Sequence, residues 1–268
     1  MPNYLIDLFI NILANVMFWL VLGLGFHCII RRTQSEFLRF FGLEHNRKLI
    51  VYLSNLWLPT MTKKPPGCIV AGQEFKVPKT LGALFGSAPF RLPELVRGLV
   101  DSFWIGSKLD VDHRVSPLDG GVEPGSSMIV VGATTKNSVR RDYLNKGMIY
   151  VTIAGEPAER PSDIHVNPLE QRFIVMRGKL KGESLQRNGD HNLAIVERIR
   201  DEKNDIIVFM CTGSHGDSSW AATEYLVRHW HELFTRFRDK SFARCLWFPY
   251  TAGPMEDYSE PCHVHDPP

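Results

Sequence analysis

The sequence predicts an α/β domain with a mostly parallel sheet in three layers, preceded by one N-terminal transmembrane helix. Three observations support this prediction. Residues 8–30 contain no Asp, Glu, Lys or Arg. Several later segments are apolar throughout, as in strands covered on both faces, and they alternate with stretches whose apolar residues recur at helical spacing. The proportions of charged residues, 22%, and of hydrophobic residues, 44%, are typical of a globular chain.

The first apolar run is long enough to cross a membrane. Its 23 residues form a helix about 34 Å long at ~1.5 Å per residue, against a hydrocarbon core of about 30 Å. A cleaved signal peptide has basic residues before such a run, and residues 1–7 have none. Arg31 and Arg32 follow the run directly. The positive-inside rule therefore places the N-terminus outside and the rest of the chain on the cytoplasmic side of the plasma (inner) membrane.

These features divide the chain into a membrane anchor (residues 1–33), a cytoplasmic domain (34–250) and a disordered tail (251–268). The net charge of +2 argues against nucleic acid as a partner, because bulk electrostatic attraction is weak. Five cysteines without paired spacing fit free thiols in a reducing compartment. The expected partners are therefore the lipid bilayer and a small anionic ligand.

Residues 33–42 predict a short amphipathic helix with phenylalanines on its apolar side and Gly42 as its stop. Two placements fit this helix: along the membrane surface, or packed on the domain as a linker. Beyond it, the apolar pattern predicts strands at 48–54, 127–133, 148–153, 205–212 and 244–250, and helices at 73–85, 89–103, 139–147 and 220–237.

Residues 127–153 predict a βαβ unit, in which two strands are joined through a helix by a right-handed crossover. Residues 173–179 and 193–199 fit an antiparallel pair, although 193–200 fits a helix equally well. Val111 and Val115 hint at one more strand, and Pro249 suggests that the last strand lies at an edge. Strands that alternate with helices across short polar turns predict a Rossmann-like three-layer architecture.

Two turns lie where ligands bind in such sheets, beyond the carboxyl ends of strands. The first turn runs from Gly132 to Ser138. Free N–H groups at a helix start favour anions, and Lys136 and Arg140 add positive charge. The candidate ligand-binding residues of this turn are Thr134, Lys136, Asn137 and Arg140. An ordinary helix cap formed by Asn137 or Ser138 explains the same residues.

The second turn, at residues 211–219, is rich in glycine and in small hydroxyl side chains. Glycines let a phosphate approach the backbone closely. The candidate ligand-binding residues of this turn are Thr212, Gly213, Ser214, His215 and Ser218. A turn capped by Asp217 or Ser218 explains the same pattern. We expect the two turns to lie on one edge of the sheet and to share one ligand.

The sequence leaves catalysis open. His215 and Glu224 are the candidate acid–base residues, but neighbours on one turn rarely meet in triad geometry, and Glu224 also fits a solvated helix face. Cys211 ends an apolar strand and is expected to be an inert buried thiol. His229 and His231 are two residues apart, so a helix sends them to different faces and no metal site is expected.

Three stretches, VYLS at 51–54, IVVGATTKN at 129–137 and VFMCTGSHGDSSWAATEYL at 208–226, carry a resemblance to a known group. Together they resemble membrane-tethered bacterial Rossmann-like ligand-sensing domains, loosely related to the SLOG and TIR-like groups. The resemblance covers about residues 48–250, and the chain lacks the dense glycine motif of a clear SLOG member. It implies a role in nucleotide-dependent defence and signalling.

The sequence therefore predicts a membrane-anchored domain that binds a nucleotide-like or other anionic small ligand and signals or forms a homo-oligomer at the membrane. Two alternatives remain. The first is a membrane-bound nucleotide hydrolase or glycosidase. The second is a non-catalytic, partner-binding membrane protein whose turns are ordinary helix caps.

Overall fold

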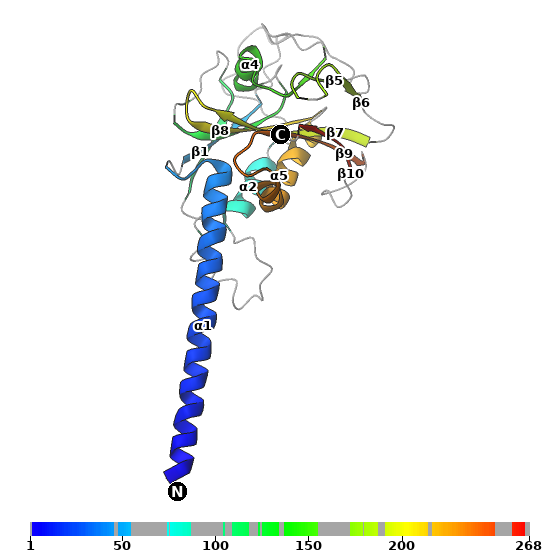
Figure 1. Ribbon diagram of the computed structural model, residues 1–268. Coiled ribbons are helices and arrows are strands. Elements are labelled where there is room, and N and C mark those ends of the chain that lie inside the picture. The colour runs from blue at the N-terminus through cyan, green and yellow to red at the C-terminus, as the bar shows by residue number, and fades with distance from the viewer. Residues whose placement is uncertain are drawn as a thin grey trace.

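A seven-stranded sheet carries the domain, and a long N-terminal helix projects from it (Figure 1). This computed structural model describes residues 2–45, 48–54, 74, 76–86, 104, 109–117, 123, 125–133, 137–154, 172–178, 180–186, 191–213, 216–249 and 259–265. The predicted helix at 89–103 lies outside the described residues.

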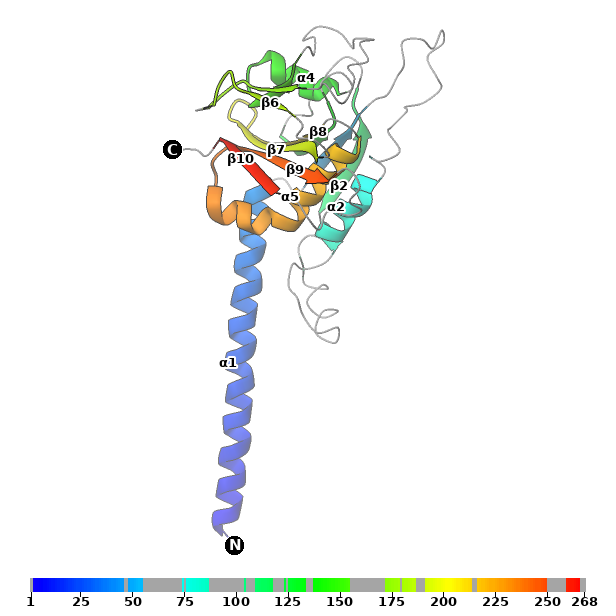
Figure 2. The same cartoon turned by 90° about the vertical axis from the view of Figure 1, so that its right-hand side faces the viewer.

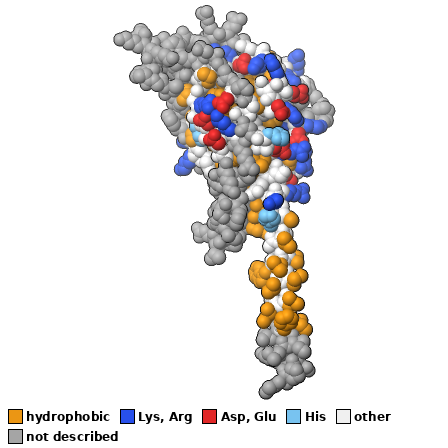
Figure 3. Space-filling view, turned by 90° about the vertical axis from the view of Figure 1, so that its left-hand side faces the viewer, with side chains coloured by type: hydrophobic (Ala, Val, Ile, Leu, Met, Phe, Trp, Pro, Cys, Tyr) orange, Lys and Arg blue, Asp and Glu red, His pale blue; other side chains and the backbone are white. Residues whose placement is uncertain are grey.

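Helix α1 (Pro2–Phe41) runs without a break, so the apolar run and the predicted amphipathic helix are one element. Its outer part is long and apolar enough to cross a membrane, with a mean hydropathy of 2.0, and its apolar side chains are exposed (Figure 3). Its end enters the domain, where Phe37, Phe40 and Phe41 are fully buried. Of the two placements predicted for residues 33–42, the structure shows packing on the domain. Gly42 follows the helix with a φ of 68°, as expected of a glycine stop.

The main sheet has the strand order β10-β9-β7-β8-β3-β1-β2. Its strands are β1 (Lys48–Leu53), β2 (Asp110–Val115), β3 (Ser127–Val131), β7 (His191–Asp201), β8 (Ile206–Gly213), β9 (Phe242–Pro249) and β10 (Ser259–His265). The four neighbours β2, β1, β3 and β8 are parallel. Strands β7 and β10 run against them, and β9 runs with them because it is antiparallel to β7. The sheet is therefore mixed, with mostly parallel strands as predicted.

Both faces of this sheet are covered (Figures 1 and 2). Helices α2 (Lys76–Gly86) and α5 (Gly216–Phe237) pack with the end of α1 on one face. The other face carries α4 (Ser138–Asn145) and a small sheet of β4 (Val151–Ile153), β5 (Arg172–Val175) and β6 (Ser184–Gln186). In β1, Leu49 and Val51 enter the core beside α5, whereas Ile50 and Tyr52 enter the core beside α4. Cover on both faces explains why this strand is apolar throughout.

The predicted βαβ unit at 127–153 is wrong, because its two strands belong to different sheets. Strand β4 pairs with β5 in the small sheet and does not extend the main sheet beside β3. The predicted pairing of 173–179 with 193–199 is also wrong, since β5 pairs with β6 and residues 191–201 form β7 of the main sheet. The residues of a short apolar strand specify that it is covered, but they do not name its partner.

Three further differences concern the C-terminal third. Strand β9 lies between β7 and β10, so Pro249 is the last residue of an internal strand and marks no edge. Strand β10 lies within the segment 251–268 that was expected to be disordered. Helix α5 begins at Gly216, four residues before its predicted start, so Asp217 lies in its first turn.

The strand hinted at by Val111 and Val115 is present as β2, at the edge of the main sheet opposite β10.

Candidate functional site

The carboxyl ends of β1, β3 and β8 lie side by side, which brings the two predicted turns to the same edge of the sheet. The N–H of Gly132 donates to the carbonyl of Cys211 at 2.9 Å. The Thr212 hydroxyl donates to the Gly132 carbonyl at 3.1 Å, and the Ser54 hydroxyl donates to the Val131 carbonyl at 3.2 Å. We call this edge, formed by Ser54, Gly132, Thr212 and Gly213, the carboxyl rim. The first residues of the two turns, Gly132 and Cys211 to Gly213, are thus neighbours at this edge, as expected.

The chain changes direction across this rim between β1 and β3. From β1 it moves to β2 on one side, and it then returns to β3 and β8 on the other side. Neighbouring strand ends whose connections leave in opposite directions form a crevice, and open α/β sheets bind ligands at such switch points. The rim therefore has the topology of a ligand site.

A buried carboxylate, that of Glu74, lies at this switch point. Its Oε2 accepts the backbone N–H of Ser54 at 2.8 Å, and its side chain is buried. Burial raises the pKa of Glu74, and hydrogen bonds from Ser54 oppose that shift. Gly132 makes this approach feasible, because a Cβ there would lie 1.7 Å from the Ser54 Oγ and 3.1 Å from the Glu74 Oε1. The lack of a side chain at Gly132 thus lets β1, β3 and Glu74 meet.

Asn137 is the N-cap of α4 and joins the ends of two strands. Its Oδ1 accepts the N–H groups of Val139 and Arg140 at 3.1 and 3.3 Å. Its Nδ2 donates to the carbonyls of Val131 at 2.9 Å and Tyr52 at 3.3 Å. The side chain is fully buried, and each polar atom already serves two hydrogen bonds. The cap explanation of this turn therefore accounts for Asn137.

Arg140 lies inside the protein and away from the rim. Its Nη2 donates to the Val151 carbonyl at 2.7 Å, and its Nη1 lies 3.4 Å from the Glu197 Oε2. Both side chains are fully buried, and Glu197 also accepts the Val151 N–H at 2.6 Å. Burial raises the pKa of Glu197 and the Arg140 guanidinium opposes that shift. The pair ties α4 and β4 to the middle of β7.

The second turn is tightly packed where it meets α5. A Cβ on Gly213 would lie 2.0 Å from the Cβ of Ser218, so the chain can pass here only as glycine. Thr212, Gly213 and Ser218 are all buried. Cys211, just before them, is buried too, and burial raises its pKa to about 12. This thiol is therefore not a nucleophile at neutral pH. Thr134, Lys136, Ser214 and His215 lie outside the described residues.

The remaining catalytic candidate, Glu224, is buried on α5 instead of facing solvent. Its Oε1 accepts from the Arg228 guanidinium, and its buried Oε2 has no hydrogen-bond partner among the described residues. Among the described residues no group of three His, Cys, Asp or Glu side chains is arranged to hold a metal ion. His231 contacts Glu36 of α1, with 3.3 Å between the His231 Nε2 and the Glu36 Oε2.

Three residues that sequence reasoning did not select lie beside this site: Glu74, Lys76 and Trp220. Lys76 begins α2, two residues after Glu74, and its Nζ lies 4.4 Å from the centre of the Trp220 ring. The Trp220 Nε1 donates to the Thr80 hydroxyl at 3.1 Å, which orients the ring. The rim therefore has a positive charge and an aromatic ring near the start of α5. The sequence alone does not single out these residues, because Lys76 and Trp220 become neighbours only through the contact between α2 and α5.

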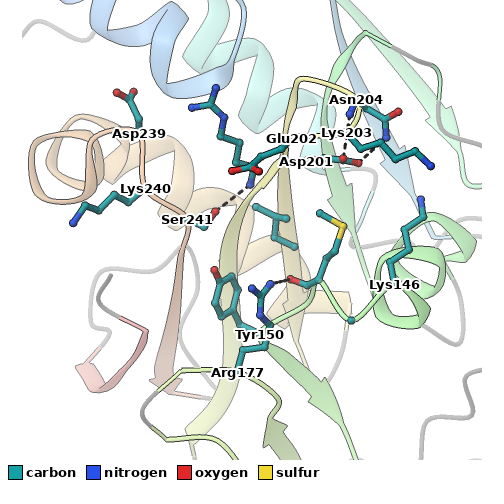
Figure 4. Close-up of a pocket in the computed structure, with 14 residues that line it drawn as sticks. Lys146, Tyr150, Arg177, Asp201, Glu202, Lys203, Asn204, Asp239, Lys240 and Ser241 are labelled. Carbon is teal, nitrogen blue, oxygen red and sulfur yellow. Dashed lines mark hydrogen bonds between the residues drawn. The ribbon is translucent and has the colours of Figure 1, made fainter. Parts of the chain in front are cut away.

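A second concave region lies at the opposite, amino edge of the parallel strands. It is a hollow of about 990 Å³ between the end of α4, the β7–β8 turn and the α5–β9 turn. Figure 4 shows Lys146, Asp201 and Lys203 on one side of it and Asp239 and Lys240 on the other. Two of its charged groups are held by α4 residues outside the lining: Lys146 pairs with Asp142 at 2.6 Å, and Asp201 accepts the Tyr143 hydroxyl at 2.8 Å. The hollow is broad and lies away from the switch point, so the rim is the stronger candidate.

Comparisons of the chain with protein-family models, with curated proteins and with solved structures found no match. The geometry of the rim and of α1 therefore carries the functional argument.

Proposed function

We propose that this protein is a single-pass membrane protein whose Rossmann-like cytoplasmic domain binds a nucleotide-like or other anionic small ligand at the carboxyl rim and signals at the membrane. The observation that carries the proposal is the switch point between β1 and β3, where Ser54, Glu74 and Gly132 meet. Ligands of open α/β sheets bind in this position.

Anchoring is supported by the exposed, apolar length of α1 and by its flanks. Most of the large apolar side chains from Phe9 to Ile29 are exposed. In water such a surface is unfavourable, at about 25 cal/mol per Å² of apolar area. Arg31 and Arg32 follow, and both are exposed, so the domain lies on the side that attracts positive charge, the cytoplasmic side.

The rim offers chemistry for both parts of a nucleotide. Glu74 can accept a hydrogen bond from a sugar hydroxyl, because each carboxylate oxygen has two lone pairs and the Ser54 N–H uses one of them. Lys76 supplies positive charge for a phosphate, and Trp220 supplies an aromatic face beside it. Arg140 contributes nothing to this recognition, since it is committed to Glu197.

Helix α5 gives the ligand site a physical connection to the anchor. Near its start, Ser218 packs against Gly213 at the rim. Further along, the Trp230 ring lies 5.2 Å from the Phe37 ring of α1, and Asp239 after the helix pairs with Arg39. A single rigid helix of 22 residues, about 33 Å long at 1.5 Å per residue, thus joins rim and anchor. Movement of its start on ligand binding is transmitted to α1, which supports signalling.

A thermal-shift panel on the full chain in detergent micelles tests the proposal. The panel contains ATP, NAD⁺, ADP-ribose and cyclic dinucleotides. A ligand present at 100 times its Kd should stabilise the fold by about 2.7 kcal/mol. We expect Lys76→Ala to lose this shift and Lys203→Ala, an equal change in the amino-edge hollow, to keep it. The reverse result would place the ligand in the hollow, and no shift with any nucleotide would refute nucleotide binding.

A second candidate function, a nucleotide hydrolase or glycosidase, is favoured by two buried carboxyl groups. The pKa of Glu74 is raised by burial at the switch point, as in general acids, and Glu224 has an unpartnered buried oxygen. Incubating the same nucleotides with the protein and separating the products by chromatography tests it. Product that disappears in Glu74→Gln supports this enzyme. If no product forms and no nucleotide gives a thermal shift, the partner-binding alternative is favoured.

A further inference from the structure

We propose that the C-terminal part of α5 is a lipid-contacting surface that binds the headgroups of anionic phospholipids and holds the domain flat on the bilayer. The surface consists of Arg236 and Arg238, together with Arg31 and Arg32 of α1; we call it the basic collar. This inference rests on the proposed anchoring of α1 and is independent of the nucleotide site.

No spacer separates the membrane span from the domain. Most side chains from Phe9 to Ile29 are exposed, whereas Ile30 and Thr33 are each only 8% exposed, and from Phe37 the same helix enters the core of the domain. The exposed run from 9 to 29 is about 32 Å long at 1.5 Å per residue, which matches a hydrocarbon core of about 30 Å. The base of the domain therefore begins where the hydrocarbon ends.

The contacts between α1 and α5 set the height of α5 above the hydrocarbon. Helix α5 meets α1 between Glu36, which contacts His231 at 3.3 Å, and Phe40, whose ring lies 6.3 Å from that of Phe234. These positions are six to ten residues beyond Ile30, or about 9–15 Å at 1.5 Å per residue. The headgroup layer is about 5–7 Å thick, so α5 lies within roughly one Debye length, about 8 Å, of its outer boundary.

The outward face of α5 points toward the membrane. Figures 1 and 2 both show α5 on the side of the sheet from which α1 leaves. Its apolar residues Trp230, Leu233, Phe234 and Phe237 are buried against the sheet and α1. The residues opposite them are exposed, and they include Arg236 and Arg238. This exposed stretch therefore faces the bilayer.

Charge and rigidity make the collar suited to anionic lipid. Its nearby acids are Glu232, Asp239 and Glu36. Asp239 is paired with Arg39, and Glu232 lies 3.0 Å from the His229 Nδ1. Glu36 pairs with Arg32 of the collar itself, so the net positive charge comes from Arg31, Arg236 and Arg238. The guanidinium of Arg238 lies over the Phe234 ring at 5.2 Å and that of Arg236 over the Phe237 ring at 5.3 Å, so packing orients both. Buried Arg198 fixes the junction itself, with Nε 3.2 Å from the Phe40 carbonyl and Nη1 3.0 Å from the Lys240 carbonyl. A fixed array of cations within roughly one Debye length of the headgroups attracts anionic lipid.

Photocrosslinking of the full chain in lipid nanodiscs tests this inference. The discs consist of phosphatidylcholine with a small fraction of phosphatidylglycerol that carries a photoreactive headgroup, and cross-linked peptides are mapped by mass spectrometry. We expect cross-links on residues 228–240. Two cations at about 1 kcal/mol each correspond to roughly 30-fold in headgroup occupancy, so R236A/R238A should reduce this cross-linking by about that factor.

Three controls make the result decisive. R236K/R238K keeps the charge and should retain most cross-linking, whereas K181A/K203A, an equal change of charge away from the collar, should leave it unaltered. Inorganic phosphate added to the buffer should compete poorly, because the occupant is a lipid and not free phosphate. Equal cross-linking in R236A/R238A and wild type, or full competition by phosphate, overturns the inference. If the chain does not enter nanodiscs, both the proposed anchor and the collar are overturned. If it enters nanodiscs but R236A/R238A cross-links as wild type does, only the collar is overturned.

Discussion

Replacing Arg140 by methionine should destabilise the domain strongly, because it leaves a carboxylate buried without its partner. The Arg140 and Glu197 side chains are fully buried 3.4 Å apart. Removing one member of such a pair typically costs about 3–5 kcal/mol. The lost hydrogen bond to the Val151 carbonyl, 2.7 Å from Nη2, adds about 1 kcal/mol. That is a large share of the 5–15 kcal/mol that stabilises a typical domain.

A double-mutant cycle in urea, followed by tryptophan fluorescence of the full chain in detergent, measures this energy. In R140M/E197Q no charge is buried, and the glutamine oxygen can still accept the Val151 N–H that Glu197 accepts at 2.6 Å. We expect the double variant to recover to within about 1–2 kcal/mol of wild type, since neutral replacements of buried pairs are often tolerated. Lys146→Met, which removes an exposed pair on the same helix, should cost at most about 1 kcal/mol.

The cost of R140M should also depend on pH in a defined direction. Burial raises the pKa of Glu197 in the folded state, and loss of the opposing arginine raises it further. The protonated form is then favoured by folding, so the deficit is small below about pH 4.3, the ordinary glutamate pKa, and grows as the pH rises. A deficit that is equal at pH 4 and pH 7, or an R140M variant as stable as wild type, refutes this account. Retained nucleotide shifts in R140M/E197Q would show that Arg140 does not contact the ligand.

Two further predictions concern the carboxyl rim. Glu74→Gln should leave stability unchanged below about pH 4.3 and become increasingly stabilising relative to wild type at higher pH, because the raised pKa of buried Glu74 makes its ionised form unfavourable; urea midpoints between pH 4 and 8 check this, and a constant difference contradicts it. Gly132→Ala should destabilise by well over the roughly 1 kcal/mol of left-handed strain, since its φ is 100° and the new Cβ would lie 1.7 Å from the Ser54 Oγ. Gly125→Ala, with a φ of 74° and open space around it, should lose only that roughly 1 kcal/mol, and equal losses at the two glycines would contradict the reasoning.

Local chemistry was enough to predict the elements that depend on their own residues. The uncharged run at 8–30 predicts a helix long enough for a membrane, and α1 has that length. The apolar segments at 48–54 and 205–212 predict covered strands, and β1 and β8 are buried on both faces. The helix predicted at 139–147 is present as α4, and Gly147 follows it with a φ of 67°. In each case a single segment contains the whole signal.

Tertiary structure decided every feature that depends on a partner. Strand β4 resembles any short apolar strand, and only its pairing with β5 removes it from the main sheet. From the sequence, Arg140 resembles a phosphate ligand at a helix start. In the fold it is buried in an ion pair with Glu197, which lies 57 residues away in the chain. Glu74 reads as a loop acid until the ends of β1 and β3 close around it. The sequence of a segment states which groups need burial or hydrogen bonds, whereas the groups that satisfy them lie far away in the chain and become neighbours only on folding.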